Sequence, residues 1–153
     1  MKKKWKLIVI AVIAALVLIQ LIPVQRTNPP VTAEIQAPAE VKAIFKTSCY
    51  DCHSHETQWP FYSHVAPVSW FIARDVHNGR EHLNFSEWGT QPEELQQFLK
   101  QQIYKEVSDG LMPLRQYVLM HPSARISDAE LNTLKQWTEP APDIEQDHDH
   151  DDH

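Results

Sequence analysis

Two cysteines occur in this chain of 153 residues, and they lie three positions apart in the stretch Cys49-Tyr50-Asp51-Cys52-His53. The pattern C-x-x-C-H is the attachment signature of a c-type haem. In such sites the two thiols bond to one porphyrin, and the histidine binds the iron as its proximal ligand. The motif therefore predicts that Cys49 and Cys52 hold one covalent haem c, with His53 on the iron, and that the chain folds around this group.

Two other kinds of site use a similar pair of cysteines. A bare C-x-x-C also occurs in redox dithiols and as half of a zinc site. A zinc site needs two further ligands, and residues 38–138 contain no second C-x-x-C. A thioredoxin-like dithiol belongs in a βαβ unit, which the sequence does not predict. We favour haem attachment and keep the dithiol and the zinc site as alternatives.

The first 24 residues have the pattern of a membrane anchor. They carry four lysines and no acidic residue, and from Trp5 to Val24 only Lys6 is charged. That apolar length is about what a helix needs to cross a bilayer. The lysines are expected on the cytoplasmic side, which places the following chain on the periplasmic side of a bacterial inner membrane. Because no small-residue cleavage site follows, an uncleaved anchor is favoured over a cleaved signal peptide.

Three further regions follow the anchor. Residues 25–37 are polar and contain Pro29-Pro30, which indicates an extended linker. Residues 38–138 form the expected haem-binding domain. Residues 139–153 are acidic and rich in His and Asp, as in a disordered tail, although weak binding of a divalent metal is an alternative. The net charge of −6 does not suggest a nucleic-acid partner, which requires a basic face.

Apolar periodicity and helix-end signals predict an all-α domain of about four helices, preceded by one transmembrane helix. The first helix covers 38–48 and leads into the cysteines. The second covers 66–78, with Gly79 as its stop. The third starts at Pro92 and ends at Gly110, and the fourth starts with the capping box Ser127-Asp128-Ala129-Glu130. Between them, His55 is expected at the surface.

The sequence Gly110-Leu111-Met112-Pro113-Leu114 offers a candidate for the other axial position of the iron. A methionine opposite histidine raises the reduction potential and favours electron transfer, and the adjacent proline stiffens the loop. The alternative is that Met112 fills a gap in the core. The rival ligands are Met120, His121, His77 and His64, of which His121 is the strongest.

On these motifs the chain resembles one broad family and one more specific family. A helix before C-x-x-C-H, a Met-Pro loop and a closing helix resemble a class I monohaem cytochrome c. At closer range the chain resembles the bacterial haem-binding domain family. That match covers about residues 38–138 and rests on the segments 49–54, 59–63, 66–70, 79–80, 83–86 and 112–114 together with Trp88, Tyr117 and His121-Pro122. The resemblance implies a cytochrome c-like bundle and a covalent haem on Cys49, Cys52 and His53, and it extends to Met112 as ligand.

Three functions are compatible with these features. The first is a membrane-anchored carrier of single electrons, which needs a redox partner protein in or near the membrane and no catalytic residues. The second is a haem sensor or peroxidase-like protein with an open sixth position, where His64 or His77 acts near the iron. The third is a non-enzymatic binding or assembly module that uses the tail. We favour the first function, because the sequence contains no nucleophile paired with a general base, the pattern that would indicate an enzyme.

Overall fold

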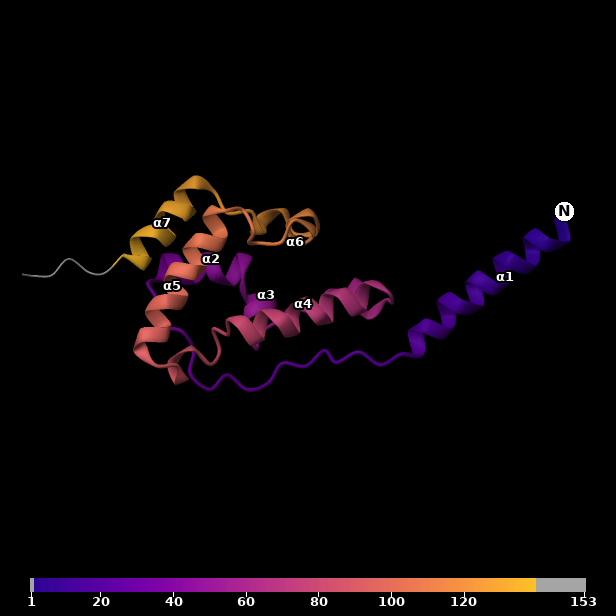
Figure 1. Cartoon of the computed structure of the whole chain (residues 1–153), viewed down its shortest axis with the longest axis horizontal. Helices are drawn as coiled ribbons and strands as arrows, with labels where there is room; N and C mark the ends of the chain where they lie inside the picture. The colour runs from indigo at the N-terminus through magenta and orange to yellow at the C-terminus, as the bar shows by residue number, and fades with distance from the viewer. Residues whose placement is uncertain (1, 140–153) are drawn as a thin grey trace, which may run out of the picture.

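The computed structural model describes residues 2–139, in which all the regular secondary structure is helical. The predicted all-α class is confirmed, with one apolar helix ahead of a small bundle (Figure 1). Seven α-helices are formed within the described residues: α1 Lys2–Leu18, α2 Ala39–Ser48, α3 Tyr50–His53, α4 Val68–His82, α5 Glu93–Ser108, α6 Arg115–Met120 and α7 Asp128–Thr138. Short 3-10 turns accompany them: η1 Ile19–Leu21, η2 Phe61–His64, η3 Trp88–Thr90 and η4 Pro122–Ala124. Residues 140–153 of the expected tail lie outside the described residues.

Helix α1 extends away from the bundle (Figure 1). Together with η1 it gives an apolar stretch, Lys3–Leu21, that is long enough to cross a membrane, and none of it is buried in the protein. Apolar side chains such as Leu7, Ile10 and Val17 are more than half exposed to the surroundings. A helix that is apolar on all sides and packs against nothing is stable in a lipid environment, where its backbone groups are paired internally.

Residues 25–37 are extended, but they do not hang free of the domain. They run alongside α4 in Figure 1 and are bonded to the domain at several points. The backbone N–H groups of Ala33 and Ile35 donate to Ser86 and Phe85, and the N–H of Gly89 donates to the carbonyl of Ala33. Ile35 is completely buried in the core. The second half of this segment is therefore part of the domain's packing.

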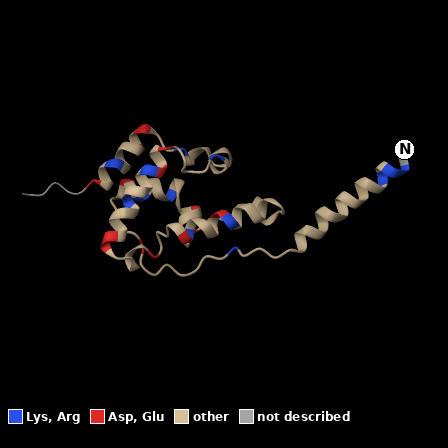
Figure 2. Ribbon diagram, in the orientation of Figure 1, with Lys and Arg blue, Asp and Glu red and all other residues tan. Residues whose placement is uncertain are grey.

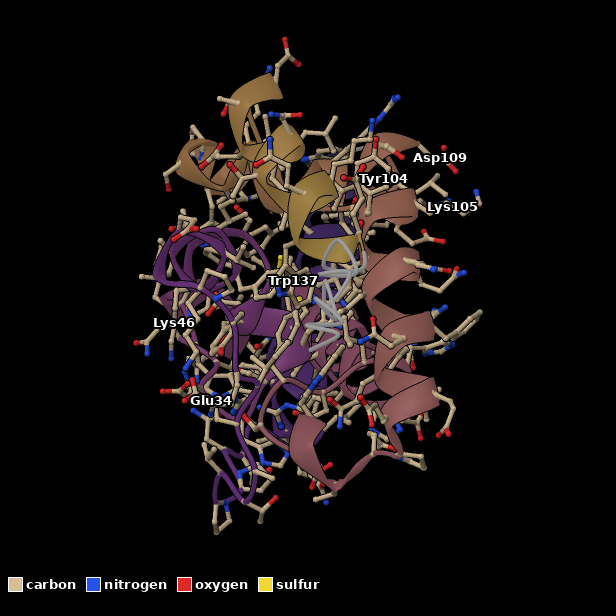
Figure 3. The ribbon with its side chains drawn as sticks, turned by 90° about the vertical axis from the view of Figure 1, so that its left-hand side faces the viewer. Glu34, Lys46, Tyr104, Lys105, Asp109 and Trp137 are labelled. Atoms are coloured by element: carbon tan, nitrogen blue, oxygen red, sulfur yellow. The ribbon has the colours of Figure 1, made fainter. Side chains whose placement is uncertain are left out.

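A stack of aromatic rings forms the centre of the core. Phe85 is fully buried between Phe45, at 4.5 Å between ring centroids, and Tyr50, at 5.2 Å. Trp137 of α7 meets the edge of Phe45 at 5.3 Å, so the closing helix is attached to α2. Charged pairs stay at the rim: Figure 3 shows Glu34 and Lys46 on one flank, and Lys105 and Asp109 on the other along α5.

Some of the predicted helix ends agree with the structure and others do not. The capping box is present, with Ser127 and Glu130 bonded reciprocally at the start of α7. Gly110 adopts a φ of 69° just after α5, as a helix stop does. The prediction that Gly79 ends the second helix is wrong, because α4 continues to His82. The prediction of a surface position for His55 is also wrong: it is 8% exposed.

Candidate functional site

The C-x-x-C-H motif forms the one-turn helix α3, directly after α2. The two residues between the cysteines fix its position on the domain. Tyr50 is buried in the aromatic stack, and its hydroxyl donates to Oε1 of Glu34 at 3.1 Å. Asp51 accepts at both carboxylate oxygens, from the N–H of Gln58 and the hydroxyl of Tyr117, each at 2.8 Å. The motif is therefore held from two sides by its own intervening residues.

The ring of His53 has a fixed orientation and a fixed tautomer. Its Nδ1 lies 3.0 Å from the carbonyl oxygen of Gly79 and 3.1 Å from that of Leu83. Carbonyl oxygens only accept, so the proton is on Nδ1. Nε2 then carries the lone pair, and it has no hydrogen-bond partner among residues 2–139. Burial lowers the pKa of His53, which keeps the ring neutral and able to bind a metal.

Gly79 allows α4 to approach the motif closely. A Cβ built on Gly79 would lie 2.6 Å from the carbonyl oxygen of Cys52 and 3.2 Å from its Cβ. The same residue gives its own carbonyl to His53. Its role is thus to bring α4 against the second cysteine and the histidine, which explains why the helix runs through this glycine.

Two apolar cavities meet at the motif. The first has a volume of about 300 Å³ and is lined by Cys49, Cys52 and His53 together with residues of α4 and of the loop after α5. The second has a volume of about 400 Å³, is lined by Cys49 and His53, and extends to Phe85, Leu99, Ile103 and Val107. Both volumes are in the range of a cofactor site. They share Ser48, Cys49, His53, His82, Met112 and Pro113, so the two cavities adjoin each other at the motif and together make up the candidate site.

The two cysteines are not joined in a disulfide, and both lie in the wall of this site. Burial raises the pKa of Cys49 and of Cys52 to about 12. A redox dithiol has the opposite property, since its attacking thiol has a lowered pKa. Among residues 2–139 there is also no group of three or more His, Cys, Asp and Glu side chains placed to hold a metal ion. These two observations favour haem attachment over the dithiol and the zinc site.

Of the five candidates for the second axial ligand, Met112 alone lines this site in the described structure. Both ring nitrogens of His121 are engaged, Nδ1 with the carbonyl of Tyr117 and Nε2 with the hydroxyl of Tyr62. His64 and Met120 are exposed elsewhere. His77 is exposed on α4 and lies 3.4 Å from Glu81.

The sequence did not point to His82, and it pointed to Tyr117 only as part of the family resemblance, without a role in the site. His82, the last residue of α4, lines both cavities, and its Nδ1 is bonded to the carbonyl of Asn78. Tyr117 connects α6 to Asp51 of the motif, and its ring stacks on His121 with centroids 4.3 Å apart. The short helix α6 has no cap or long apolar period, so only the tertiary contacts reveal that it closes over the motif.

Tyr117→Phe should lower the free energy of unfolding by about 1–2 kcal/mol, since it removes a hydrogen bond to a partly buried carboxylate. Tyr104→Phe is the matched control, because Tyr104, which lies on α5 (Figure 3), makes no side-chain hydrogen bond among the described residues. Chemical denaturation followed by tryptophan fluorescence measures both. Equal stability of the two variants would show that the Tyr117–Asp51 bond does not hold α6.

Comparison with known proteins agrees with this geometry. No curated protein and no solved structure matches the chain. The family model described as haem-binding domain matches residues 14–140, a range that includes the motif, both cavities and all the helices of the bundle. Because this model covers most of the chain, the chain belongs to the haem-binding domain family, and haem is its cofactor.

Proposed function

We propose that this protein is a membrane-anchored carrier of single electrons whose one haem is a covalent haem c on Cys49 and Cys52. The observation that carries the proposal is the orientation of His53. Its Nδ1–H is held by two backbone carbonyls of the α4 end, so Nε2 is left free beside the cavity. An iron-binding histidine requires this arrangement, because the hydrogen bonds of Nδ1–H fix the tautomer of the ring and leave the lone pair on Nε2 for the metal.

The residues that line the cavity are suited to holding haem. Bound haem supplies an iron that changes its charge by one electron. The chain supplies an apolar wall of Phe85, Leu99, Ile103 and Val107, which excludes water from that iron. We further propose that Met112 binds the iron opposite His53. Its loop is fastened by two hydrogen bonds, in which the N–H groups of Leu111 and Met112 donate to the carbonyl of Glu106.

The anchor and the compartment complete the proposal. The apolar helix α1 carries its lysines at the N-terminal end, so the positive-inside rule places residues after 24 on the periplasmic side of a bacterial inner membrane. Covalent haem attachment is compatible with that side of the membrane. The redox partner is then a protein in or near the same membrane, within reach of the domain at 38–138.

Met112→Ala should remove the charge-transfer band that a methionine ligand gives at the red end of the visible spectrum of the oxidised protein. It should also lower the reduction potential, since the methionine thioether stabilises reduced iron, and allow rapid binding of carbon monoxide. Met120→Ala is the matched control, because this methionine is 55% exposed and lines neither cavity. Visible spectroscopy, a redox titration and carbon monoxide mixing measure the three effects.

The same experiment separates electron transfer from a sensor or peroxidase-like function. If the unaltered protein already binds carbon monoxide rapidly, its sixth position is open and Met112 is a core residue. If the band persists in Met112→Ala and disappears in Met120→Ala, the assignment of the ligand is wrong while the haem site stands. The exposed positions of His64 and His77, which line neither cavity, favour the closed iron.

A further inference from the structure

A group of exposed apolar side chains lies where η2 meets the start of α4. Phe61 is 82% exposed and Phe71 is 61% exposed, and Val65 and Val68 lie between them with about half of their surface uncovered. Val68 and Phe71 are three positions apart on α4 and share one face of it. Isolated apolar residues on a surface need no explanation, but a group of large ones on one turn marks a contact surface. We call these four residues the apolar turn.

This turn is attached to the end of the apolar N-terminal stretch. The side-chain amide of Gln20 pairs with the backbone of Ala66: its Nε2–H donates to the Ala66 carbonyl at 3.1 Å, and its Oε1 accepts from the Ala66 N–H at 2.9 Å. Gln20 lies one residue before the end of the stretch Lys3–Leu21 that is long enough to cross a bilayer. Any bilayer that α1 spans therefore has its surface at the level of Ala66.

Charge is absent from the same part of the domain. Residues 57–73 contain no Asp, Glu, Lys or Arg. Figure 2 shows η2 and the half of α4 nearest α1 without red or blue, whereas charged residues are spread over the remainder of the bundle. Contact with water alone gives no physical reason for a surface segment as long as residues 57–73 to lack charged side chains. A face that reaches the boundary between the headgroups and the acyl chains must lack charge, and aromatic rings are favoured at this depth.

We propose that the apolar turn of Phe61, Val65, Val68 and Phe71 inserts into the headgroup region of the bilayer that α1 spans. This inference rests on the proposed membrane anchor. The occupant of the surface is lipid, because Gln20 ties the turn to the point where the chain leaves the membrane. The bundle is then held in one orientation by two contacts, the anchor and the turn. As a result, the same side of the haem site always faces a membrane-bound partner.

Photo-crosslinking in the intact haem protein tests the insertion. The variants Phe61→p-benzoylphenylalanine and Phe71→p-benzoylphenylalanine keep an aromatic ring at each position. Each is reconstituted in vesicles of phosphatidylcholine and phosphatidylglycerol, irradiated and examined by mass spectrometry. We expect lipid adducts at both positions. The control Lys105→p-benzoylphenylalanine, whose side chain is 62% exposed on α5, should give no lipid adduct.

A fourth probe, Leu16→p-benzoylphenylalanine in α1, distinguishes the possible failures. A lipid adduct at Leu16 with none at Phe61 and Phe71 overturns the insertion and leaves the anchor intact. No lipid adduct at any of the four positions overturns the anchor and the insertion together. Adducts of Phe61 or Phe71 to a second copy of the chain overturn the proposal in favour of a dimer contact. Equal lipid adducts at Lys105 overturn it as well, because the contact would then be unspecific.

Discussion

Cys49→Ala/Cys52→Ala should yield a polypeptide whose mass after denaturation equals that of its amino acids alone. The unaltered protein should be heavier by one haem and should keep its colour in denaturant. The reason is that thioether bonds survive unfolding, whereas coordination by His53 and packing in the cavity do not. Mass spectrometry under denaturing conditions and a haem stain of a denaturing gel measure the difference.

Alanine is the appropriate replacement for these cysteines. Cys49 and Cys52 lie in the apolar wall of the cavity, and serine there would bury hydroxyl groups without partners, at a cost of about 1–3 kcal/mol each. The control is a folded variant: the double alanine protein should retain a helical circular dichroism spectrum and should still bind added haem through His53, reversibly. A natural protein that is colourless after denaturation, with both sulfurs free or joined to each other, would contradict covalent attachment and leave the family's haem binding in place.

The motif and the long helices could be predicted because their signals are local. The register of Cys49, Cys52 and His53 is contained in five residues, and the capping box of α7 in four. Met112 could be selected from its loop composition, and the structure places it in the wall of the cavity. Whether it binds iron stays a prediction.

The remainder of the site depends on contacts between distant segments. His55 has no local signal of burial, but its Nδ1–H donates to the carbonyl of Pro30 and its Nε2 accepts from the side chain of Asn84. Both partners lie more than twenty positions away. Arg80 similarly donates to the carbonyls of Ser54 and Thr27, and so ties the segment 25–37 to the chain after the motif. Neither pairing can be inferred from composition or period.

Gly79 shows most clearly that contacts between distant segments cannot be inferred from the local sequence. Local signals suggest a helix stop, because glycine is common just after a helix. In the structure the residue is inside α4 with an ordinary helical backbone, and the need for glycine comes from Cys52, 27 positions earlier. A contact across such a distance leaves no mark on the neighbouring residues.

Gly79→Ala should lower the free energy of unfolding by about 1–2 kcal/mol and disturb the iron's axial ligand. Two effects of opposite sign compete. Alanine inside a helix is normally more stable than glycine by about 0.5–1 kcal/mol. Against this, the new methyl would lie 2.6 Å from the carbonyl oxygen of Cys52, and such overpacking costs about 1–3 kcal/mol. The second effect should prevail, because the opposing atom is backbone and cannot rotate away.

The variant also tests the link between packing and the haem site. Moving α4 away from Cys52 lengthens the bond from Nδ1 of His53 to the carbonyl of Gly79, so the visible spectrum should change together with the stability. Gly89→Ala is the control: its methyl would lie 3.1 Å from Cβ and 3.6 Å from the carbonyl oxygen of Ala33, outside the motif, and should cost about 1 kcal/mol with an unchanged spectrum. Denaturation of the haem-loaded protein and its visible spectrum measure both variants. If Gly79→Ala instead stabilises the protein by the usual helical gain and leaves the spectrum unchanged, the close approach of α4 to the cysteine motif does not exist, and the fixed orientation of His53 loses its structural basis.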